Sequence, residues 1–462
     1  MMRPLDSRII DINSATLGVN TDELMDNAGR ALAEVIEDLF RGKRILFVCG
    51  NGNNGGDGLA AAYHLAGKNV DVALIGSEKD VKTDESRRRL SMLKERPRSL
   101  ADVNVVDYDI VVDCIVGAGF KGKLRSDAAK AVRIVNKAKT VISADMPSGF
   151  GTSISVKPKI TVTFHDIKDG MNEKNSGNII VADIGIPDDA VSFIGPGDML
   201  RYPIPDKDSH KGQNGRLLII GGGPYVGAPA MAAMAAQRIG VDIVRIATPK
   251  RSFLQISSMS PTFMTLELSD DVLCPSDIAP LIRLSNDYDA VLIGPGLGTD
   301  EKTKKSVVAF LEDCKIPTVI DADAIAPASS SAPFHETFIY TPHRKELETM
   351  LRATSCGNVA DFASKKNAVV VTKGRTDEIT DGTKLRKNRS GCAAMTVGGT
   401  GDVLAGTIAG LLSKGMTAFD AACLGTYICG KAGESAFGQF SYGMIATDVI
   451  DHIPKVLKEY LK

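Results

Sequence analysis

Residues 44–67 read RILFVCGNGNNGGDGLAAAYHLAG, a strand, a loop and a helix in immediate succession. The apolar run 44–49 does not alternate with polar residues, which is typical of a strand buried on both faces in a parallel sheet. Five glycines and three asparagines then crowd into residues 50–58 before the helix begins. Glycines let backbone N–H groups face a ligand, and a helix start adds partial positive charge. The stretch therefore predicts a phosphate-binding loop, although it is neither GxGxxG nor GxxxxGK[ST].

Further short apolar runs alternate with helical stretches on both sides of this motif. In the first half they are DIVVDCIVG (109–117), TVISADMP (140–147), KITVTF (159–164) and NIIVADIG (178–185). Residues 195–215 are rich in Pro, Gly and charge and indicate a junction. The alternation then restarts at RLLIIGGG (216–223), and EITDGTKLRK (378–387) predicts a hairpin with Asp-Gly at its tip. We expect an α/β fold with two layered domains, residues 1–203 and 204–462.

Composition excludes several classes of protein. The 462 residues carry 55 Lys and Arg against 56 Asp and Glu, a net charge of -1 that gives no support for nucleic-acid binding. No apolar run approaches the ~20 residues that span a bilayer, and the start shows no signal core, so we expect no membrane partner. Eight dispersed Cys and six dispersed His argue against disulfides or structural zinc and favour the cytoplasm. The small-residue helix at 228–237 leads us to expect a homo-oligomer.

Polar residues follow two more strands of the first half. Asp113 ends one strand and precedes a second glycine loop at 117–123, and Asp145 ends another, with Ser148 just beyond. Ligands of parallel sheets bind outside the carboxyl ends of the strands. We therefore expect a binding site at this edge, although Asp113 or Asp145 could each be a structural cap.

The second half contains VGGTGDVLAGTIAGLL at 397–412. Gly398, Gly399, Thr400 and Gly401 offer backbone amides to an anion, and Asp402 lies at the helix start, where it can act on a substrate hydroxyl. Asp321 and Asp323 follow another strand, but a structural role is equally compatible with them and we assign them none.

The segments LMDNAG (24–29), NGNNGGDG (51–58), VDCIVGAG (112–119) and DMPSG (145–149) together resemble the NAD(P)H-hydrate epimerases. The resemblance implies a Rossmann-like three-layer αβα domain with Asp145 as catalytic residue and substrate contact. It implies a potassium ion between Asn54, Asp113 and Ser148, which suits hard oxygen donors. The other substrate-binding residues that it implies are Asn53, Asn54, Gly55, Gly56, Asp57, Gly117, Ala118, Gly119, Phe120, Lys121, Gly122 and Lys123.

The second half, with HKGQNGRLLIIGGG (210–223), GPGLG (294–298), TPHRKEL (341–347) and the GGTGD loop, resembles the ADP-dependent NAD(P)H-hydrate dehydratases, which are ribokinase-like αβα proteins. The resemblance implies Asp402 as catalytic base and a magnesium ion. It implies Ala228, Gly298, His343 and Asp402 as substrate contacts, and as adenine-nucleotide contacts Lys373, Gly374, Arg375, Thr376, Asp377, Gly398, Gly399, Thr400 and Gly401.

These resemblances predict a metabolite-repair enzyme. The first domain would interconvert the R and S epimers of hydrated NADH and NADPH at C6. The second would dehydrate the S epimer at the expense of ADP, giving AMP and phosphate, although the loop itself does not separate ADP from ATP. Two alternatives stay open: a thiazole or pyrimidine kinase fused to a nucleotide-binding regulatory domain, and a non-catalytic first domain that only binds nucleotides or RNA-associated partners.

Overall fold

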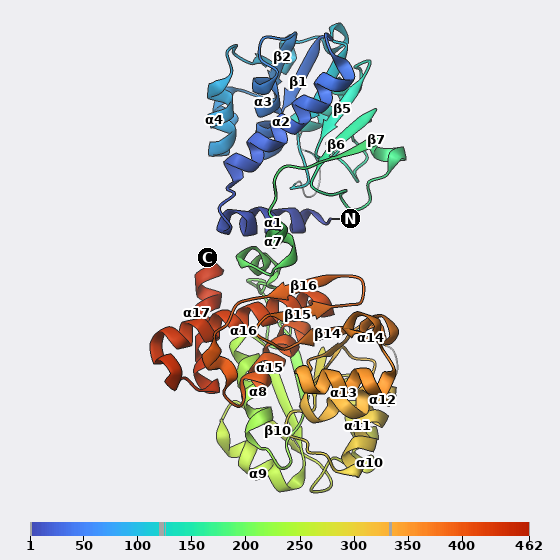
Figure 1. Ribbon diagram of the computed structural model, residues 1–462, viewed down its shortest axis with the longest axis vertical. Helices are drawn as coiled ribbons and strands as arrows, with labels where there is room; N and C mark the ends of the chain where they lie inside the picture. The colour runs from blue at the N-terminus through green and yellow to red at the C-terminus, as the bar shows by residue number, and fades with distance from the viewer. Residues whose placement is uncertain (1, 120–123, 125, 332–334, 462) are drawn as a thin grey trace. The chain divides into compact units, whose positions relative to one another are not determined.

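A computed structural model describes residues 2–119, 124, 126–331 and 335–461 of the chain. The fold divides into two compact units, Met1–Val191 and Ser192–Lys462. Each unit is an α/β structure around its own sheet (Figure 1), as the sequence predicts.

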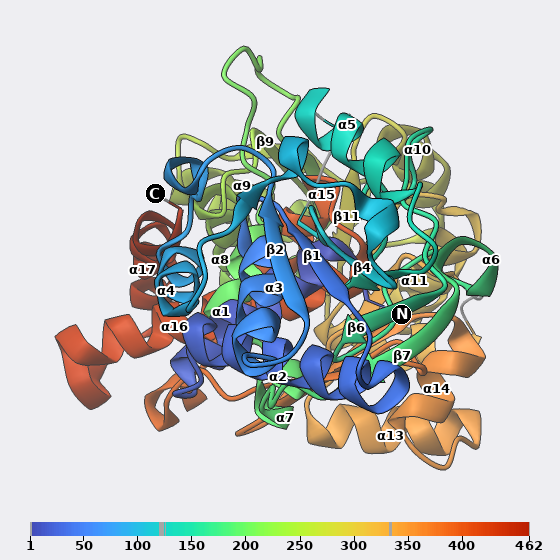
Figure 2. The ribbon, with the colours of Figure 1, turned by 90° about the horizontal axis from the view of Figure 1, so that it is seen from above.

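The first unit is built on a seven-stranded sheet of order β3-β2-β1-β4-β5-β6-β7, in which every paired strand is parallel. Its strands are β1 (Ile45–Cys49), β2 (Val70–Leu74), β3 (Arg98–Ser99), β4 (Ile110–Cys114), β5 (Val141–Ala144), β6 (Ile160–Phe164) and β7 (Asn178–Ala182). Its helices are α1 (Pro4–Thr16), α2 (Thr21–Phe40), α3 (Asn53–His64), α4 (Asp84–Met92), α5 (Ser126–Val135), α6 (Glu173–Ser176) and α7 (Asp188–Ser192). Figure 2 shows α3 lying across β1 and β2.

Strand β1 explains why the apolar run does not alternate. Phe47 packs in a core with α2 and α3, whereas Leu46 and Val48 pack in a second core with α5. Both faces of the sheet are therefore covered, and successive residues of β1 are buried on opposite faces of the sheet.

The second unit is built on a nine-stranded sheet of order β10-β9-β8-β11-β12-β13-β14-β15-β16. Its strands are β8 (Arg216–Ile220), β9 (Ile243–Thr248), β10 (Met264–Glu267), β11 (Ala290–Ile293), β12 (Thr318–Ile320), β13 (Phe338–Tyr340), β14 (Val369–Thr372), β15 (Asp377–Thr380) and β16 (Leu385–Asn388). Its helices are α8 (Gly227–Arg238), α9 (Lys250–Met259), α10 (Pro275–Ser285), α11 (Glu301–Asp313), α12 (Ile325–Ser331), α13 (Arg344–Thr354), α14 (Val359–Lys366), α15 (Thr400–Ser413), α16 (Ala418–Phe440) and α17 (Ala446–Tyr460).

The antiparallel pair β15–β16 confirms the predicted hairpin, with Asp381 and Gly382 between the strands. Alternate residues of β8 again separate two cores. Leu217 packs with α8, α15 and α16, and Leu218 packs with α10 and α11.

The division between the units lies at 191/192, whereas the sequence analysis places the domain boundary at 203/204. Packing of the intervening segment explains the difference. Ile194 and Met199 are buried in the core of the second unit. The backbone N–H of Ile194 donates to the carbonyl of Lys387 on β16 at 2.8 Å. The first residues of the Pro- and Gly-rich junction therefore pack in the second unit.

Close approach of helices requires small residues in the second unit. A Cβ on Gly406 of α15 would lie 2.2 Å from the carbonyl oxygen of Ala232 on α8, so only glycine fits at this crossing. The small residues of α8, including Ala232 and Ala236, are buried in the core of this unit. Helix α8 was expected to offer an exposed surface for assembly, and the structure contradicts that expectation because α8 is covered within the chain.

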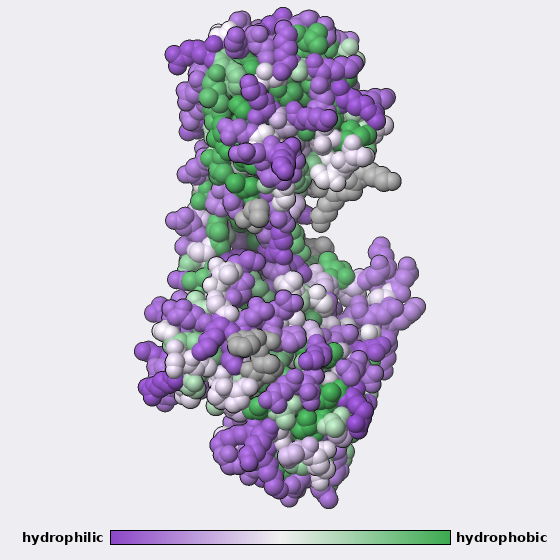
Figure 3. Space-filling model, turned by 90° about the vertical axis from the view of Figure 1, so that its right-hand side faces the viewer, coloured by the Kyte–Doolittle hydropathy of each residue, from purple (hydrophilic) through white to green (hydrophobic). Residues whose placement is uncertain are grey.

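On the face drawn in Figure 3, hydrophobic side chains occupy small areas among hydrophilic ones. Among the helices that the structure describes, none combines the length and apolar character needed to cross a membrane.

Candidate active sites

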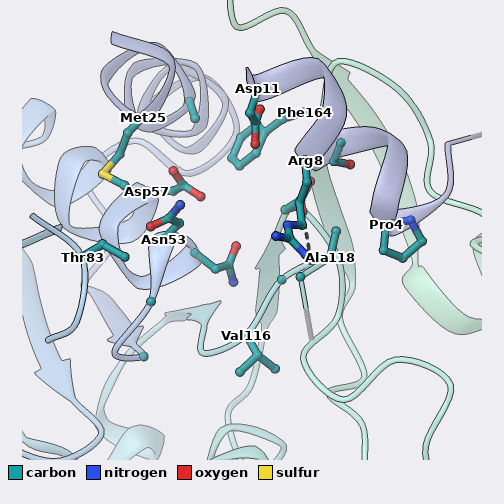
Figure 4. A pocket seen from close by; sticks show the side chains of 18 of the residues that line it. Pro4, Arg8, Asp11, Met25, Asn53, Asp57, Thr83, Val116, Ala118 and Phe164 are labelled. Atoms are coloured by element: carbon teal, nitrogen blue, oxygen red, sulfur yellow. Dashed lines mark hydrogen bonds between the residues drawn. The ribbon is translucent and has the colours of Figure 1, made fainter. Parts of the chain in front are cut away.

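A cavity of about 940 Å³ opens in the first unit at the carboxyl ends of β1, β4 and β5. It is lined by the glycine loop after β1, including Asn53, Asn54 and Asp57, by the loop after β4 from Ile115 to Gly119, and by Asp145 after β5. Figure 4 shows Asn53, Asp57 and Ala118 around this cavity. The strand ends that the sequence singled out therefore come together in one site.

Tight packing shapes the glycine loop. A Cβ on Gly55 would lie 2.0 Å from the carbonyl oxygen of Gly50, so the first turn of α3 closes directly over the end of β1. Gly56 is equally enclosed, because a Cβ there would lie 2.4 Å from Ser86 Oγ. The loop therefore presents Asn53 and Asp57 toward the cavity with little room to move.

Asp145 lies at a strained position directly after β5, with a φ of 65° in the left-handed region. Its Oδ1 forms an ion pair with Lys168 Nζ at 2.5 Å, and its Oδ2 accepts a hydrogen bond from the Ala118 N–H at 3.3 Å. Lys168 is only 2% exposed, and its Nζ also donates to the carbonyl of Phe164 at 2.7 Å. Asp145 is thus a carboxylate held in place at the cavity by a buried cation.

Two further carboxyl groups line the same cavity. Burial raises the pKa of Asp57 well above its ordinary value, and the charges of Asp145 and Asp11 add to the effect. Burial raises the pKa of Asp11, on α1, to about 6, with a further contribution from Asp145, while Lys168 opposes it. The cavity therefore combines an ion-paired carboxylate with carboxyl groups that retain protons more readily.

The predicted potassium ligands lie at the floor of this region. Asp113 is fully buried, and its Oδ1 accepts a hydrogen bond from Ser148 Oγ at 2.6 Å. Ser143 Oγ and the Ser148 N–H donate to Asp113 Oδ2 at 2.8 and 2.9 Å. The amide oxygen and nitrogen of Asn54 are buried without a hydrogen-bond partner among the described residues. The orphaned Asn54 amide oxygen and the oxygens of Asp113 and Ser148 are hard donors of the kind that suits a monovalent cation.

The structure describes only part of the second glycine loop, for which the resemblance implies substrate contacts. Gly117, Ala118 and Gly119 line the cavity. Phe120, Lys121, Gly122 and Lys123 lie outside the described residues.

In the second unit, Gly398 and Gly399 lead into α15, which begins with Thr400 and Gly401, and Gly399 takes a left-handed φ of 98°. Asp402 lies in the first turn of the helix. Burial and the charge of Asp321 together raise the pKa of Asp402 to about 7, and the charge of Lys373 opposes this shift. Asp402 is therefore a base poised near neutral pH, as a general base requires.

Lys373 and Asp321 form the charged neighbourhood of Asp402. Lys373 Nζ lies 3.0 Å from Asp321 Oδ1, which also accepts a hydrogen bond from Thr341 Oγ1 at 2.6 Å. A Cβ on Gly401 would lie 3.6 Å from Lys373 Nζ, so the lysine lies beside the GGTGD loop. Asp321 had no assigned role in the sequence analysis, although its place directly after β12 was a usable signal.

The remaining predicted residues of the second unit occupy defined local structures. His343 caps α13, its Nδ1 accepting from the Glu346 N–H at 3.2 Å, and its backbone is bridged to Lys373. Gly298 donates its N–H to Asp323 Oδ2 at 2.8 Å, and Ala228 lies in the first turn of α8. Asp377 closes its turn by accepting from the Gly374 N–H at 3.0 Å. Gly374, Arg375 and Thr376 are exposed there.

Lys168 and Asp11 are the site residues that sequence reasoning missed. Neither belongs to a glycine loop. Lys168 follows β6, and Asp11 lies on a helix that precedes every quoted motif. The sequence signal that could have identified Lys168 is a charged residue shortly after a strand. Asp11 lies on a helix and carries no such signal.

The model of the NAD(P)H-hydrate dehydratase family matches residues 217–455, and the model of the YjeF-related protein N-terminus matches residues 21–170. The bifunctional NAD(P)H-hydrate repair enzyme Nnr of Methanothermobacter thermautotrophicus is 38% identical, covering 99% of this chain and 95% of that protein. The enzyme of the same name from Archaeoglobus fulgidus is 36% identical, with coverages of 98% and 97%.

Among solved structures, the ADP/ATP-dependent NAD(P)H-hydrate dehydratase of Bacillus subtilis, co-crystallised with ATP/Mg2+, is 25% identical. It superposes with a TM-score of 0.50 over 58% of this chain and 98% of that chain. This similarity confirms the ribokinase-like architecture expected for the second half. With both halves matched and relatives aligned end to end, the chain belongs to the family of bifunctional NAD(P)H-hydrate repair enzymes.

Proposed function

We propose that this chain repairs hydrated NADH and NADPH in two steps. The first unit interconverts the R and S epimers at C6, and the second unit dehydrates the S epimer at the expense of ADP, giving AMP and phosphate. The observation that carries the proposal is that each unit has its own carboxyl group beside a lysine at the carboxyl edge of its own sheet. These are Asp145 with Lys168, and Asp402 with the pair of Lys373 and Asp321.

In the first unit, Asp145 is the acid–base group for the C6 hydroxyl. The hydroxyl is on a carbon bonded to the ring nitrogen, whose lone pair assists its departure and leaves C6 open to water on either face. A positioned carboxyl group contributes about 10²–10⁴-fold to such a step. Asn53, Asp57 and the loop from Gly117 to Gly119 line the cavity that holds the nucleotide.

In the second unit, Asp402 deprotonates the C6 hydroxyl, which attacks the terminal phosphorus of ADP. The bond from that phosphorus to the bridging oxygen breaks, and AMP leaves. The resulting phosphate ester then departs from C6 as phosphate, and loss of a proton from C5 restores the ring double bond. Backbone amides from Gly398 to Gly401 and the ammonium group of Lys373 stabilise the charge of the phosphates.

Two metal ions belong to this proposal. Asn54, Asp113 and Ser148 would hold K⁺, which supplies fixed positive charge beneath the glycine loop. In the part of the chain that the structure describes, no group of three His, Cys, Asp or Glu side chains is arranged to hold a metal ion. Mg²⁺ would therefore be bound largely by nucleotide phosphates, where it neutralises their charge.

The alternatives are less well supported. A thiazole or pyrimidine kinase is not favoured, because the relatives aligned over the whole chain are named repair enzymes. A non-catalytic first unit would not need the buried Asp145–Lys168 pair, which is costly unless used. We also expect a cytoplasmic protein, and the homo-oligomer stays a prediction from the sequence alone, because helix α8, on which it was based, is covered within the chain. All eight cysteines are free, which agrees with a reducing compartment, and light scattering of the purified chain will give its mass in solution.

The test supplies mixed epimers with ADP to two variants of the full chain. Asp145→Asn should dehydrate only the S fraction at enzymatic speed, and Asp402→Asn should epimerise without dehydrating. A mixture of the two variants should recover all of the reduced cofactor, because the intermediate diffuses between molecules. Each variant is the folding control for the other unit. A stable phosphorylated product, or the absence of complementation, would contradict the proposal, and parallel reactions with ATP will measure the preference between the two nucleotides.

A further inference from the structure

We propose that Asp11, on the N-terminal helix α1, is a second acid–base residue of the first unit, acting together with Asp145 on the C6 hydroxyl of the substrate. This inference rests on the proposed epimerase activity. It concerns a segment outside residues 21–170, the range that the family model matches.

Helix α1 is a fixed wall of the cavity. Its residues Pro4, Ser7, Arg8 and Asp11 line the cavity, while Ile9 is buried with 1% exposure. The helix is anchored at both ends. The Met2 N–H donates to the Ile167 carbonyl at 2.9 Å, and Asn13 Nδ2 donates to the Ala190 carbonyl at 3.4 Å.

These anchors determine where Asp11 lies relative to the catalytic ion pair. Met2 forms a backbone bridge with Lys168, the partner of Asp145. The position of α1 is therefore tied to the residue that holds the catalytic carboxylate. Figure 4 shows Asp11 and Asp57 entering the cavity from α1 and α3, which are separate walls.

No contact with another described residue explains the position of the Asp11 carboxyl group. Its carboxyl group is half-buried, and it forms no hydrogen bond or ion pair with any residue that the structure describes. Asp6, on the same helix, in contrast caps α1 by accepting from the Arg3 N–H at 3.1 Å. An unpartnered carboxyl group in a cavity is unfavourable unless a ligand engages it.

The surroundings of Asp11 favour its protonated form more than an exposed position would. Lys168 forms an ion pair with Asp145, whereas burial and the neighbouring Asp145 raise the pKa of Asp11 to about 6. The other ionisable side chains that line the cavity are Arg8, Asp57, Asp80, Lys82, Asp127 and His165, and burial lowers the pKa of His165. Asp57 belongs to the glycine loop, three residues after the proposed cation ligand Asn54.

Inversion at C6 needs a proton donor for the departing hydroxyl and a proton acceptor for the incoming water. In one direction, the Asp11 carboxylic acid gives its proton to the departing hydroxyl. The C6–O bond breaks, water leaves, and the ring nitrogen lone pair forms a C=N bond. A second water then adds to C6 from the opposite face while Asp145 takes its proton. The nitrogen regains its lone pair, and the product differs from the substrate only in configuration. The reverse reaction starts with Asp145 protonated and Asp11 ionised, and proton exchange with solvent resets the two groups.

The test uses the full chain with purified R epimer and with purified S epimer, each with ADP. Recovery of reduced cofactor from the R epimer requires epimerisation, whereas recovery from the S epimer requires only the second unit. Asp11→Asn should lower kcat for the R epimer by about 10²–10⁴-fold with KM changed by less than about threefold. Recovery from the S epimer should not change, and Asp11→Glu should restore part of the lost rate.

A pH profile distinguishes acid–base action from a structural role. Wild-type epimerisation should show a limb near pH 6, and Asp11→Asn should lack it. Asp6→Asn, on the same helix but outside the cavity, is the matched control and should keep both the limb and more than half of the rate. The inference is overturned if Asp11→Asn stays within about threefold of wild type, or if Asp6→Asn loses as much rate. If the wild-type chain itself does not accelerate recovery from the R epimer, the proposed epimerase activity fails instead.

Discussion

Dehydration by the second unit should depend on the ionisation of Asp402 near neutral pH. Burial and the charge of Asp321 move the pKa of Asp402 from 3.8 to about 7. Because the base must be ionised, the active fraction is about 10% at pH 6 and about 90% at pH 8, which predicts about a tenfold rise in kcat/KM. Asp321→Asn removes the neighbouring negative charge and frees Lys373, so it should shift this limb to lower pH.

The same shift has a cost for stability. A carboxyl group whose pKa is raised on folding stabilises the native state below its unfolded pKa, and this advantage is lost as pH rises through the folded pKa. At 1.36 kcal/mol per pKa unit, the raised pKa of Asp402 lowers the free energy of unfolding by about 2 kcal/mol at pH 5 and by up to about 4 kcal/mol at pH 8. The reference is a carboxyl group with the same pKa in the folded and unfolded states. Asp402→Asn should therefore abolish dehydration and raise the free energy of unfolding of the second unit, more at pH 8 than at pH 5.

The assay follows the absorbance of the reduced nicotinamide ring from purified S epimer and ADP across this pH range, with urea unfolding in matched buffers. A flat wild-type profile between pH 6 and pH 8 would refute the reasoning. So would an Asp402→Asn protein that retains the wild-type rate, or one that is no more stable than wild type at pH 8.

Three further predictions address the ion, the boundary and the packing. Replacing K⁺ by tetramethylammonium at equal ionic strength should slow epimerisation but not dehydration of the S epimer, and unchanged epimerisation would contradict the site at Asn54, Asp113 and Ser148. Fragments 1–191 and 192–462 should each fold. A second fragment starting at residue 204 should unfold at lower urea, because it lacks buried Ile194 and Met199, worth about 1.5–3 kcal/mol each, and equal stabilities would argue against the 191/192 division. Gly406→Ala should lower the free energy of unfolding of the second unit by more than about 2 kcal/mol, because the added Cβ meets the Ala232 carbonyl oxygen at 2.2 Å. Gly438→Ala is the control, since Gly438 lies on the exposed surface of α16 with open space around it, and it should be neutral or stabilising in the same unfolding measurement.

The sequence alone was sufficient for the features that depend on neighbours along the chain. A buried strand, a glycine loop and a helix start are contiguous in 44–67, so their order and the place of Asp57 follow from local propensity and periodicity. The same holds for Asp145 at a strand end, for Asp402 at a helix start and for the hairpin around Asp381 and Gly382. The parallel sheets follow as well, because continuous apolar strands separated by helices have few other ways to bury both faces.

Only the tertiary structure decided which distant residues complete each site. Lys168 contacts Asp145 because parallel β5 and β6 are neighbours, and Asp321 contacts Lys373 because β12, β13 and β14 are adjacent in the sheet. Asp11 reaches the cavity because α1 is anchored to the segment after β6. The boundary at 191/192 has the same origin, since Ile194 and Met199 are buried by residues far along the chain. Long-range packing and burial have no local signature, and burial is also what moves the pKa of Asp402 and of Asp11 toward neutrality.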